Sequence, residues 1–546
     1  MTEEVSIPRM VAEVLRMHGA EWVFGVVGSG NFAVTDALVA AGVEFRAARH
    51  EAGALGMADG VYRSTGQIAV CSVHQGPGFT NTLTALTEAA KSRTPLVVVA
   101  GATSAGSHRS NFEIDQDLLA RVAGAACITL RAEPEIVAEL SSAVDDAVRD
   151  CRPLVVNMPL DVQASTILAP VQWPEPRKSA PAPVSPDAVT VLAKALGQAK
   201  RPVFIAGRGA WVSGAGESLR GLTRRTGAVL ANTAVVKGFA DSDPASVGIS
   251  GGFSNDTAVR ALEQADLIVG IGCSFTHWTT RSNTIFNEGT TVVQVDYDEH
   301  ALALNGRVDL AVCADAALLV DALNHDERIE RREPWFDPGE PEPEPEPTAP
   351  RQAGAHGSIH PRELTRELES ILPAQRTLTI DGGHFIGWPA TGLSVPDPRG
   401  FLFSSAGFQS IGLGLGIAIG AAFARPDRLS VLVSGDGGFL MSLADLETAV
   451  RYQLPLLVVV YDDEAYGAEV HHFGPEGADV GIVRFPPTAI CEFVRGLGGR
   501  GLTLTSVADL DPVVDWLADP RGLMVVDAKI DPTVVGFWAE QDFVGH

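Results

Sequence analysis

The sequence predicts an α/β protein composed of three doubly wound parallel-sheet domains. Short runs rich in Val, Ile and Leu recur along the chain, and in its first part each run is followed by Gly and then by a helical pattern. This alternation is typical of βαβ units, which assemble into parallel sheets covered by helices. The chain has 546 residues, 46% of them hydrophobic, which suffices for two to four domains, each with its own core.

The first domain is expected at residues 1–175 and the second at 187–325, with a Pro-rich join at 170–186 between them. Short β-rich apolar runs mark the strands of both domains. The strand candidates are 23–27, 68–73 and 95–100 in the first domain, and 202–206, 265–270 and 291–295 in the second.

The third domain is expected at residues 355–546, after an acidic, Pro-rich stretch at 326–354. A stretch of alternating Glu and Pro cannot build a core, so we interpret it as an extended linker. Within the third domain, the apolar run 429–433, the helical pattern that begins at Leu443 and the apolar run 454–460 form a predicted βαβ unit.

The net charge of −26 and six scattered cysteines limit the classes of function. Nothing in so acidic a chain neutralises phosphates in bulk, so we expect no nucleic-acid partner and no acidic membrane surface. The cysteines lack Cys-x-x-Cys spacing and are expected as small buried thiols. The acidic N-terminus has no signal-peptide pattern and no apolar run reaches membrane length, so a cytoplasmic protein is expected.

Acidic residues end both strands of the βαβ unit in the third domain, where open α/β sheets place their ligands. The first strand ends in Gly435-Asp436-Gly437-Gly438, and Asp463 follows 27 positions after Asp436, at the end of the second. Two carboxylates can hold a hard divalent cation through oxygen, and glycine lets the backbone approach an anion closely. A metal held next to glycine amides suits a diphosphate.

This segment resembles the thiamine-diphosphate motif of the decarboxylase and acetohydroxyacid-synthase superfamily. The Gly-Asp-Gly, the spacer and the polar pair before Glu464-Ala-Tyr-Gly467 correspond, although the family usually has Asn-Asn at 462–463. The three units would then be a pyrimidine-binding, a central Rossmann-like and a diphosphate-binding domain. The resemblance implies thiamine diphosphate and Mg²⁺ as cofactors, with metal ligands from Asp436, Asp463 and Ala465. It implies cofactor contacts from Gly435, Asp436, Gly437, Gly438, Asp463 and Tyr466.

Two further segments extend the resemblance. Arg49-His50-Glu51-Ala52-Gly53, followed by 57–62, is similar to the cofactor-activating segment of the family. The implied role of Glu51 is a hydrogen bond to N1′ of the aminopyrimidine, which favours the imino form that deprotonates the thiazolium. Ile411 matches the large apolar residue that supports the bent cofactor. In the family, Glu51 and Asp436 come from different subunits, which implies a homodimer or homotetramer with active sites at the subunit interface.

The residues that select the reaction resemble two groups of decarboxylases. Ser29, His74 and His277 resemble catalytic positions of benzoylformate decarboxylase. Glu469, six residues past Asp463, matches the proton-relaying Glu of pyruvate and indolepyruvate decarboxylases. Phe112 stands where acetohydroxyacid synthases carry Gln, and the Lys they place a few residues later is missing, which argues against an ordinary acetohydroxyacid synthase.

The predicted function is that of a thiamine-diphosphate-dependent enzyme that decarboxylates a 2-oxo acid non-oxidatively through an enamine intermediate. The alternative is a carboligase or an acyloin or 2-hydroxyacyl lyase, and a second alternative is a cofactor-binding protein without catalysis. No Gly-x-Gly-x-x-Gly opens the second domain, so FAD is not supported. The choice between aliphatic and aromatic substrates stays open.

Overall fold

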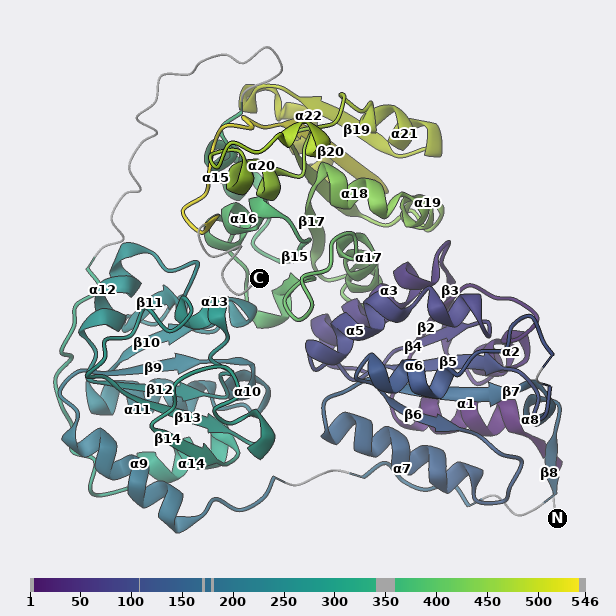
Figure 1. Ribbon diagram of the computed structural model, residues 1–546, viewed down its shortest axis with the longest axis horizontal. Coiled ribbons are helices and arrows are strands. Elements are labelled where there is room, and N and C mark those ends of the chain that lie inside the picture. Colours follow the sequence, from purple (N-terminus) through teal and green to yellow (C-terminus); the bar gives the residue numbers. More distant parts are fainter. Residues whose placement is uncertain (1–3, 108, 169–171, 178–180, 340–358, 540–546) are drawn as a thin grey trace.

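The computed structural model describes residues 4–107, 109–168, 172–177, 181–339 and 359–539, and it contains three six-stranded parallel sheets interleaved with helices (Figure 1). The predicted α/β class with three parallel-sheet domains is therefore confirmed. Part of the Pro-rich stretch, residues 340–358, lies outside the described residues. Before it, Trp335 donates a hydrogen bond from Nε1 to the Pro202 carbonyl, so this part of the predicted linker lies against the second domain.

The first domain is doubly wound around the strand order β3-β2-β4-β5-β7-β6. Strand residues alternate between two buried faces, because successive side chains of a strand point to opposite sides. Val70 packs with α1, α2 and α7 on one face, and Cys71 packs with α3, α5 and α6 on the other. The main elements are α1 Ile7–Met17, β2 Trp22–Gly25, α2 Phe32–Ala40, β3 Glu44–Ala47, α3 Glu51–Thr65, β4 Val70–Val73, α5 Leu83–Lys91, β5 Val97–Ala102, α6 Gln116–Val122, β6 Ala126–Thr129, α7 Ile136–Arg149 and β7 Leu154–Pro159. Two short strands, β1 Glu4–Ser6 and β8 Thr166–Leu168, pair antiparallel beside them.

The second domain has the strand order β11-β10-β9-β12-β13-β14. Its sheet is buried on both faces by helices, as the continuous apolar strands predict. Its elements are α9 Pro186–Gln198, β9 Pro202–Ala206, α10 Arg208–Val212, α11 Gly216–Thr226, β10 Val229–Asn232, β11 Ser246–Ile249, α12 Asp256–Gln264, β12 Leu267–Ile271, α13 His277–Thr280, β13 Thr291–Asp296, β14 Leu310–Cys313 and α14 Ala316–Asn324.

The third domain has the strand order β16-β15-β17-β18-β20-β19, so the predicted βαβ unit forms the centre of its sheet. The two predicted strands are β17 and β18, and they pair parallel from Ser430 with Leu456 to Gly435 with Tyr461. The elements are α15 Pro361–Ile371, β15 Arg376–Ile380, α16 Gly387–Gly392, β16 Phe401–Phe403, α17 Gly414–Ala424, β17 Leu429–Gly435, α18 Asp436–Met441, α19 Leu443–Arg451, β18 Leu456–Asp462, α20 Gly467–Phe473, α21 Ile490–Leu497, β19 Arg500–Leu504, α22 Asp511–Ala518 and β20 Leu523–Lys529.

Helix α3 of the first domain packs closely against α17 of the third (Figure 1). Glycines make the approach possible: a Cβ on Gly60 would lie 2.1 Å from the Ile417 carbonyl oxygen, and one on Gly420 would lie 2.0 Å from the Met57 carbonyl oxygen. One hydrophobic core therefore continues from the first domain into the third. Since Glu51 is the first residue of α3, this packing fixes the position of Glu51.

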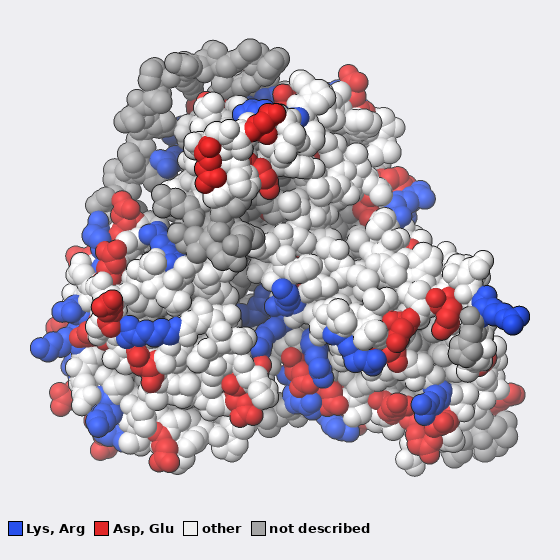
Figure 2. Space-filling model, in the orientation of Figure 1, with Lys and Arg blue, Asp and Glu red and all other residues white. Residues whose placement is uncertain are grey.

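The surface carries both signs of charge. Acidic and basic side chains are interspersed over the face shown in Figure 2. Among the described residues, no helix combines the length and the apolar character that crossing a membrane would require.

Candidate functional site

Acidic side chains meet where β17 and β18 end side by side. Asp436 is the first residue of α18 and Asp463 follows β18, and their exposed fractions are only 7% and 8%. Burial, and then the carboxylates of Asp462 and Asp463, raise the pKa of Asp436 to about 8. Burial, opposed by the Ala465 amide and reinforced by Asp462, raises the pKa of Asp463 to about 7. Such crowded carboxylates favour a bound cation.

Asp462 forms an ion pair with Lys529. Its Oδ2 accepts a hydrogen bond from Lys529 Nζ at the end of β20, and the same ammonium lies 3.2 Å from Asp527 Oδ2. Asp462 also caps the following turn, because its Oδ1 accepts from the Glu464 amide at 3.0 Å. Since these contacts engage Asp462, the carboxylates here that could hold an external cation are Asp436 and Asp463.

The loop after Asp463 is held by a short antiparallel bridge. Glu464 adopts a positive φ of 57°, a strained backbone conformation of the kind found at ligand sites. The Phe485 amide donates to the Glu464 carbonyl at 2.8 Å, and the Tyr466 amide donates to the Val483 carbonyl at 2.9 Å. Because the bonds are made by residues on either side of Ala465, its carbonyl takes no part in the pairing. This carbonyl could therefore serve as a ligand oxygen.

The glycines after Asp436 leave no room for side chains. A Cβ on Gly437 would lie 2.8 Å from Cε1 of Tyr466. A Cβ on Gly438 would lie 2.5 Å from Asp381 Oδ2 and 3.0 Å from Cγ2 of Ile411. The exposed side chains of Ile411 and Tyr466 thus lie next to the glycine segment.

Among the described residues, no three His, Cys, Asp or Glu side chains gather in a group able to ligate a metal alone. Two carboxylates and one carbonyl are an incomplete set of oxygen ligands. Mg²⁺ is commonly held in this way, by one or two carboxylates together with phosphate oxygens. The donor set therefore fits a cation that binds together with a phosphate group.

A second group of predicted residues lies in the first domain, after the carboxyl ends of β2, β3 and β4. Glu51 Oε2 accepts a hydrogen bond from Asn81 Nδ2 at 2.9 Å. A Cβ on Gly78 would lie 3.4 Å from Glu51 Oε1 and 3.1 Å from His74 Cβ. Glu51 and His74 are thus neighbours across Gly78.

His74 also faces Ser29. Its Nδ1 lies 2.9 Å from the Gln75 carbonyl, which can only accept, so Nδ1 carries a proton. Its Nε2 lies 3.4 Å from Ser29 Oγ. The Phe112 ring lies edge-on to the imidazole at 4.9 Å. Ser29, Glu51, His74 and Phe112 therefore form one first-domain group.

The remaining predicted residues lie elsewhere. His277 is the first residue of α13 in the second domain, and the ring of the adjacent Trp278 stacks on Phe253 at 5.2 Å. Glu469 lies half-buried on α20 of the third domain. No hydrogen bond between described residues joins the first-domain group to Ile411, Asp436, Asp463, Tyr466 or Glu469.

Sequence reasoning missed several residues that shape the site. Asp381 follows β15 and accepts hydrogen bonds from the amides of Gly412 and Gly414. His384 Nε2 lies 3.6 Å from Asp463 Oδ2, and burial and nearby His471 lower the pKa of His384 to about 3. An acidic residue directly after an apolar strand was the available signal for Asp381, whereas nothing local marked His384 or Lys529.

Three family models cover most of the chain. Residues 6–120 match the thiamine pyrophosphate enzyme N-terminal TPP binding domain, residues 189–323 the central domain and residues 381–528 the C-terminal TPP binding domain.

Curated relatives match over nearly the full length. The acetolactate synthase isozyme 2 large subunit of Escherichia coli is 30% identical, covering 95% of this chain and 95% of the relative. The sulfoacetaldehyde acetyltransferase of Castellaniella defragrans is 27% identical, covering 95% and 91%. Among solved structures, the thiamine diphosphate-dependent 4-hydroxybenzoylformate decarboxylase of Rhodococcus jostii has a TM-score of 0.81 at 20% identity, covering 97% of this chain and all of that one. At that identity the likeness shows the fold.

Proposed function

Because the chain belongs to the thiamine pyrophosphate enzyme family, we propose that it uses thiamine diphosphate and Mg²⁺ to decarboxylate a 2-oxo acid non-oxidatively. The observation that carries this reaction is the first-domain group. An imidazole and a hydroxyl face each other beside Glu51, and Phe112 forms an apolar wall next to them.

The third-domain residues suit the cofactor. Asp436, Asp463 and the Ala465 carbonyl would hold Mg²⁺, and Gly435, Gly437 and Gly438 would admit the diphosphate. Ile411 and Tyr466, 44% and 38% exposed, offer apolar surface to the rest of the cofactor. When bound, thiamine diphosphate supplies a nucleophilic carbon that attacks the keto carbon and takes up the electron pair left by carbon dioxide.

The protein's own residues would activate the cofactor, orient the 2-oxo acid and supply the proton that completes the product. Glu51 would hold a proton against N1′ of the aminopyrimidine, and Asn81 fixes the direction of its carboxyl. Ser29, and His74 when it also carries a proton on Nε2, would donate hydrogen bonds to the carboxylate of the 2-oxo acid. Glu469 and His277 would deliver the proton that releases the aldehyde.

A second copy of the chain would complete the site. Within one chain, no hydrogen bond between described residues joins the first-domain group to the third-domain group. Both domains expose apolar side chains: Phe32 and Phe112 in the first, Met441 and Phe485 in the third. We propose a homodimer or homotetramer in which Glu51 of one copy faces Asp436 of another.

Product analysis tests the proposed reaction. Purified protein with Mg²⁺ and thiamine diphosphate is incubated with aliphatic and aromatic 2-oxo acids, with and without an acceptor aldehyde. We expect free aldehyde in stoichiometric amount with carbon dioxide. Ligation product without free aldehyde would refute the decarboxylase assignment.

That second outcome would identify a carboligase, which is the alternative favoured by the relatives. The curated relatives reported above are named as an acetolactate synthase and an acetyltransferase. A carboligase would join the decarboxylated donor to a second carbonyl, either that of an added aldehyde or that of a second 2-oxo acid molecule, and the acceptor that gives the highest kcat/KM would identify the second substrate.

Hydrogen–deuterium exchange at thiazolium C2 separates both enzymes from a protein that binds the cofactor without catalysis. We expect the bound cofactor to exchange faster than free thiamine diphosphate, and Glu51→Gln to slow this exchange by about 100-fold or more. Equal exchange in the parent and in Glu51→Gln would rule out the role given to Glu51.

A further inference from the structure

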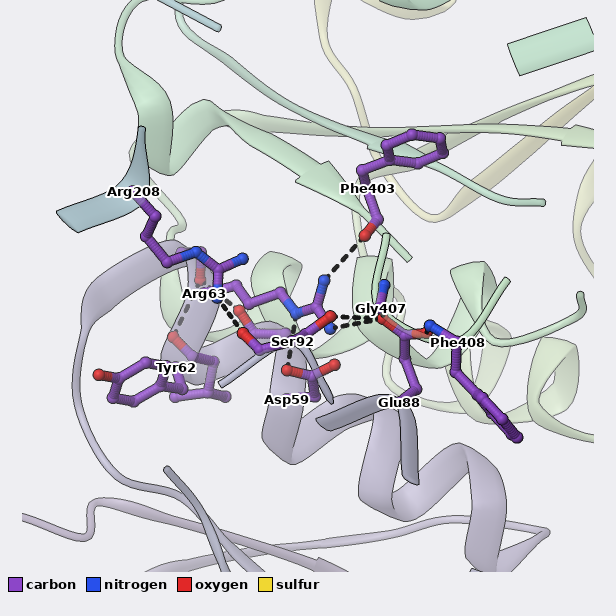
Figure 3. A network of polar contacts seen from close by, with 12 residues as sticks. Asp59, Tyr62, Arg63, Glu88, Ser92, Arg208, Phe403, Gly407 and Phe408 are labelled. Carbon is purple, nitrogen blue, oxygen red and sulfur yellow. Dashed lines mark hydrogen bonds and ion pairs between the residues drawn. The ribbon is translucent and has the colours of Figure 1, made fainter. Parts of the chain in front are cut away.

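A buried polar network joins the first domain to the loop that carries Ile411 (Figure 3). Glu88 on α5 is fully buried. Its Oε1 accepts from the Gly407 amide at 3.0 Å, and its Oε2 accepts from the Phe408 amide at 2.7 Å. A carboxylate of the first domain thus binds two consecutive amides of the third.

Glu88 is itself held from two sides. Arg63 Nη2 lies 3.3 Å from Glu88 Oε1, and Ser92 Oγ donates to the same oxygen at 2.5 Å. Arg63 also donates to the Phe403 carbonyl at 2.8 Å and to Asp59 at 2.7 Å. Arg208 of the second domain donates to the Ser92 carbonyl, so all three domains meet here.

The loop that carries Ile411, residues 404–412, has little room to move where it contacts α5. A Cβ on Gly407 would lie 2.7 Å from both the Ser92 amide nitrogen and its Oγ, so the loop backbone presses against the end of α5. Lys91 Nζ lies 4.8 Å from the Phe408 ring centre. At the other end of the loop, Asp381 accepts from the Gly412 amide at 3.0 Å. The loop is therefore held by two carboxylates: Glu88 of the first domain binds its middle, and Asp381 of the third domain binds Ser404 and Gly412 at its two ends.

We infer that Glu88 is a positioning residue that holds loop 404–412, and with it Ile411, in the place from which Ile411 supports the cofactor. The inference rests on the proposed function for the role of Ile411, whereas the clamp itself stands on the described contacts. Glu88 reaches the cofactor only through this loop. Each first domain would then serve two sites of the dimer: Glu51 serves the partner's cofactor, and Glu88 serves that of its own chain.

The experiment compares Glu88→Gln with a matched control at the same junction. Asp59→Asn also alters a carboxylate bound to Arg63, but Asp59 touches no amide of the loop. The first measurement is hydrogen exchange of the Gly407 and Phe408 amides in the protein without cofactor. Loss of a charge-assisted hydrogen bond should speed their exchange at least about tenfold in Glu88→Gln and leave it within about twofold in Asp59→Asn. Unchanged exchange in Glu88→Gln would overturn the clamp.

The second measurement is C2 exchange of bound thiamine diphosphate at saturating cofactor. We expect Glu88→Gln to slow it about tenfold or more, and the double variant with Ile411→Ala to be no slower than Ile411→Ala alone, since both changes act through one support. Normal C2 exchange in Glu88→Gln, or additive effects, would overturn the inference. A parent protein without C2 exchange would instead refute the proposed function and leave the amide measurement to decide the clamp.

Ser92→Ala covers the case in which Glu88→Gln does not fold. This variant removes only the hydroxyl that donates to Glu88, so the charge of the carboxylate remains. We expect the Gly407 and Phe408 amides to exchange about threefold faster while the rest of α5 keeps its protection. Exchange rates equal to those of the parent would count against the clamp.

Discussion

Asp381 and Asp436 occupy equivalent places on neighbouring strands, yet their surroundings are opposite. Asp381 follows β15 and Asp436 follows β17, the two strands pair parallel, and two glycines come after each aspartate. Asp381 accepts hydrogen bonds from the Gly412 and Gly414 amides and from the hydroxyls of Ser404 and Ser434. Asp436 is stabilised by its own amide and that of Gly437, and it faces the carboxylates of Asp462 and Asp463, which raise its pKa.

The difference lies in the donors around each carboxylate. A buried carboxylate that is satisfied by internal donors stabilises the fold, whereas one crowded by like charges binds a cation. Burial raises the pKa of Asp381, but hydrogen bonds from Gly382, Gly412 and Ser404 oppose the rise. At Asp436 the neighbouring charges add to the effect of burial. The same substitution at the two positions should therefore have opposite consequences.

The largest effect is expected from Asp436→Asn on cofactor binding. Removing a charged metal ligand should lower the affinity for thiamine diphosphate in the presence of Mg²⁺ by more than about 100-fold, since even outer partners of metal ligands contribute 10–100-fold. The protein without cofactor should keep or gain stability, because the raised pKa of Asp436 shows that the fold disfavours its charged form. Calorimetric titration and thermal unfolding measure the two quantities, and unchanged affinity would remove Asp436 from the site.

Asp381→Asn should act on stability instead. Because the Gly412 amide donates to both carboxylate oxygens, the NH2 group of Asn faces this amide in either orientation. The buried donors left unpaired cost about 1–3 kcal/mol of unfolding free energy. The loss should be the same with and without Mg²⁺. Urea unfolding in both conditions measures it, and a loss that appeared only with the metal would assign Asp381 to the metal site.

Much of the fold followed from the sequence, because continuous apolar strands and glycine-rich ends define parallel sheets locally. The glycine segment and Asp436 were predictable for the same reason. Asp381 was missed although Ile380-Asp381-Gly382-Gly383 has the same local pattern, because its meaning depends on Gly412 and Gly414, some thirty residues later. The roles of Lys529 and Glu88 could not be predicted from the sequence for a similar reason, since each depends on a partner in a distant segment. Phe112 was placed by its motif, but its contact with His74 required the structure.

The pH dependence of stability should distinguish the crowded carboxylates from ordinary ones. In the folded protein the pKa of Asp436 is about 8 and that of Asp463 is about 7, against 3.8 for an ordinary Asp. Between these values the folded state binds more protons than the unfolded state, so stability falls as pH rises. In EDTA, Tm should drop by a few degrees from pH 6 to pH 8, and Mg²⁺ with thiamine diphosphate should raise it more at pH 8. Asp436→Asn should flatten the EDTA profile, and an unaltered profile would contradict the assignment.

The smallest effect is expected from Asp463→Asn, which restores the amide usual in the family. The amide oxygen can still ligate a cation, so cofactor binding should persist with an affinity for Mg²⁺ lower by about tenfold or less. Asp436 would lose one of its two acidic neighbours, while Asp462 keeps its contact with Lys529. Tm in EDTA should therefore rise by about one or two degrees, and the increase produced by Mg²⁺ should shrink. A lower Tm in EDTA would mean that the Asp463 carboxylate is stabilised by His384, 3.6 Å away, more than it is destabilised by Asp436 and Asp462.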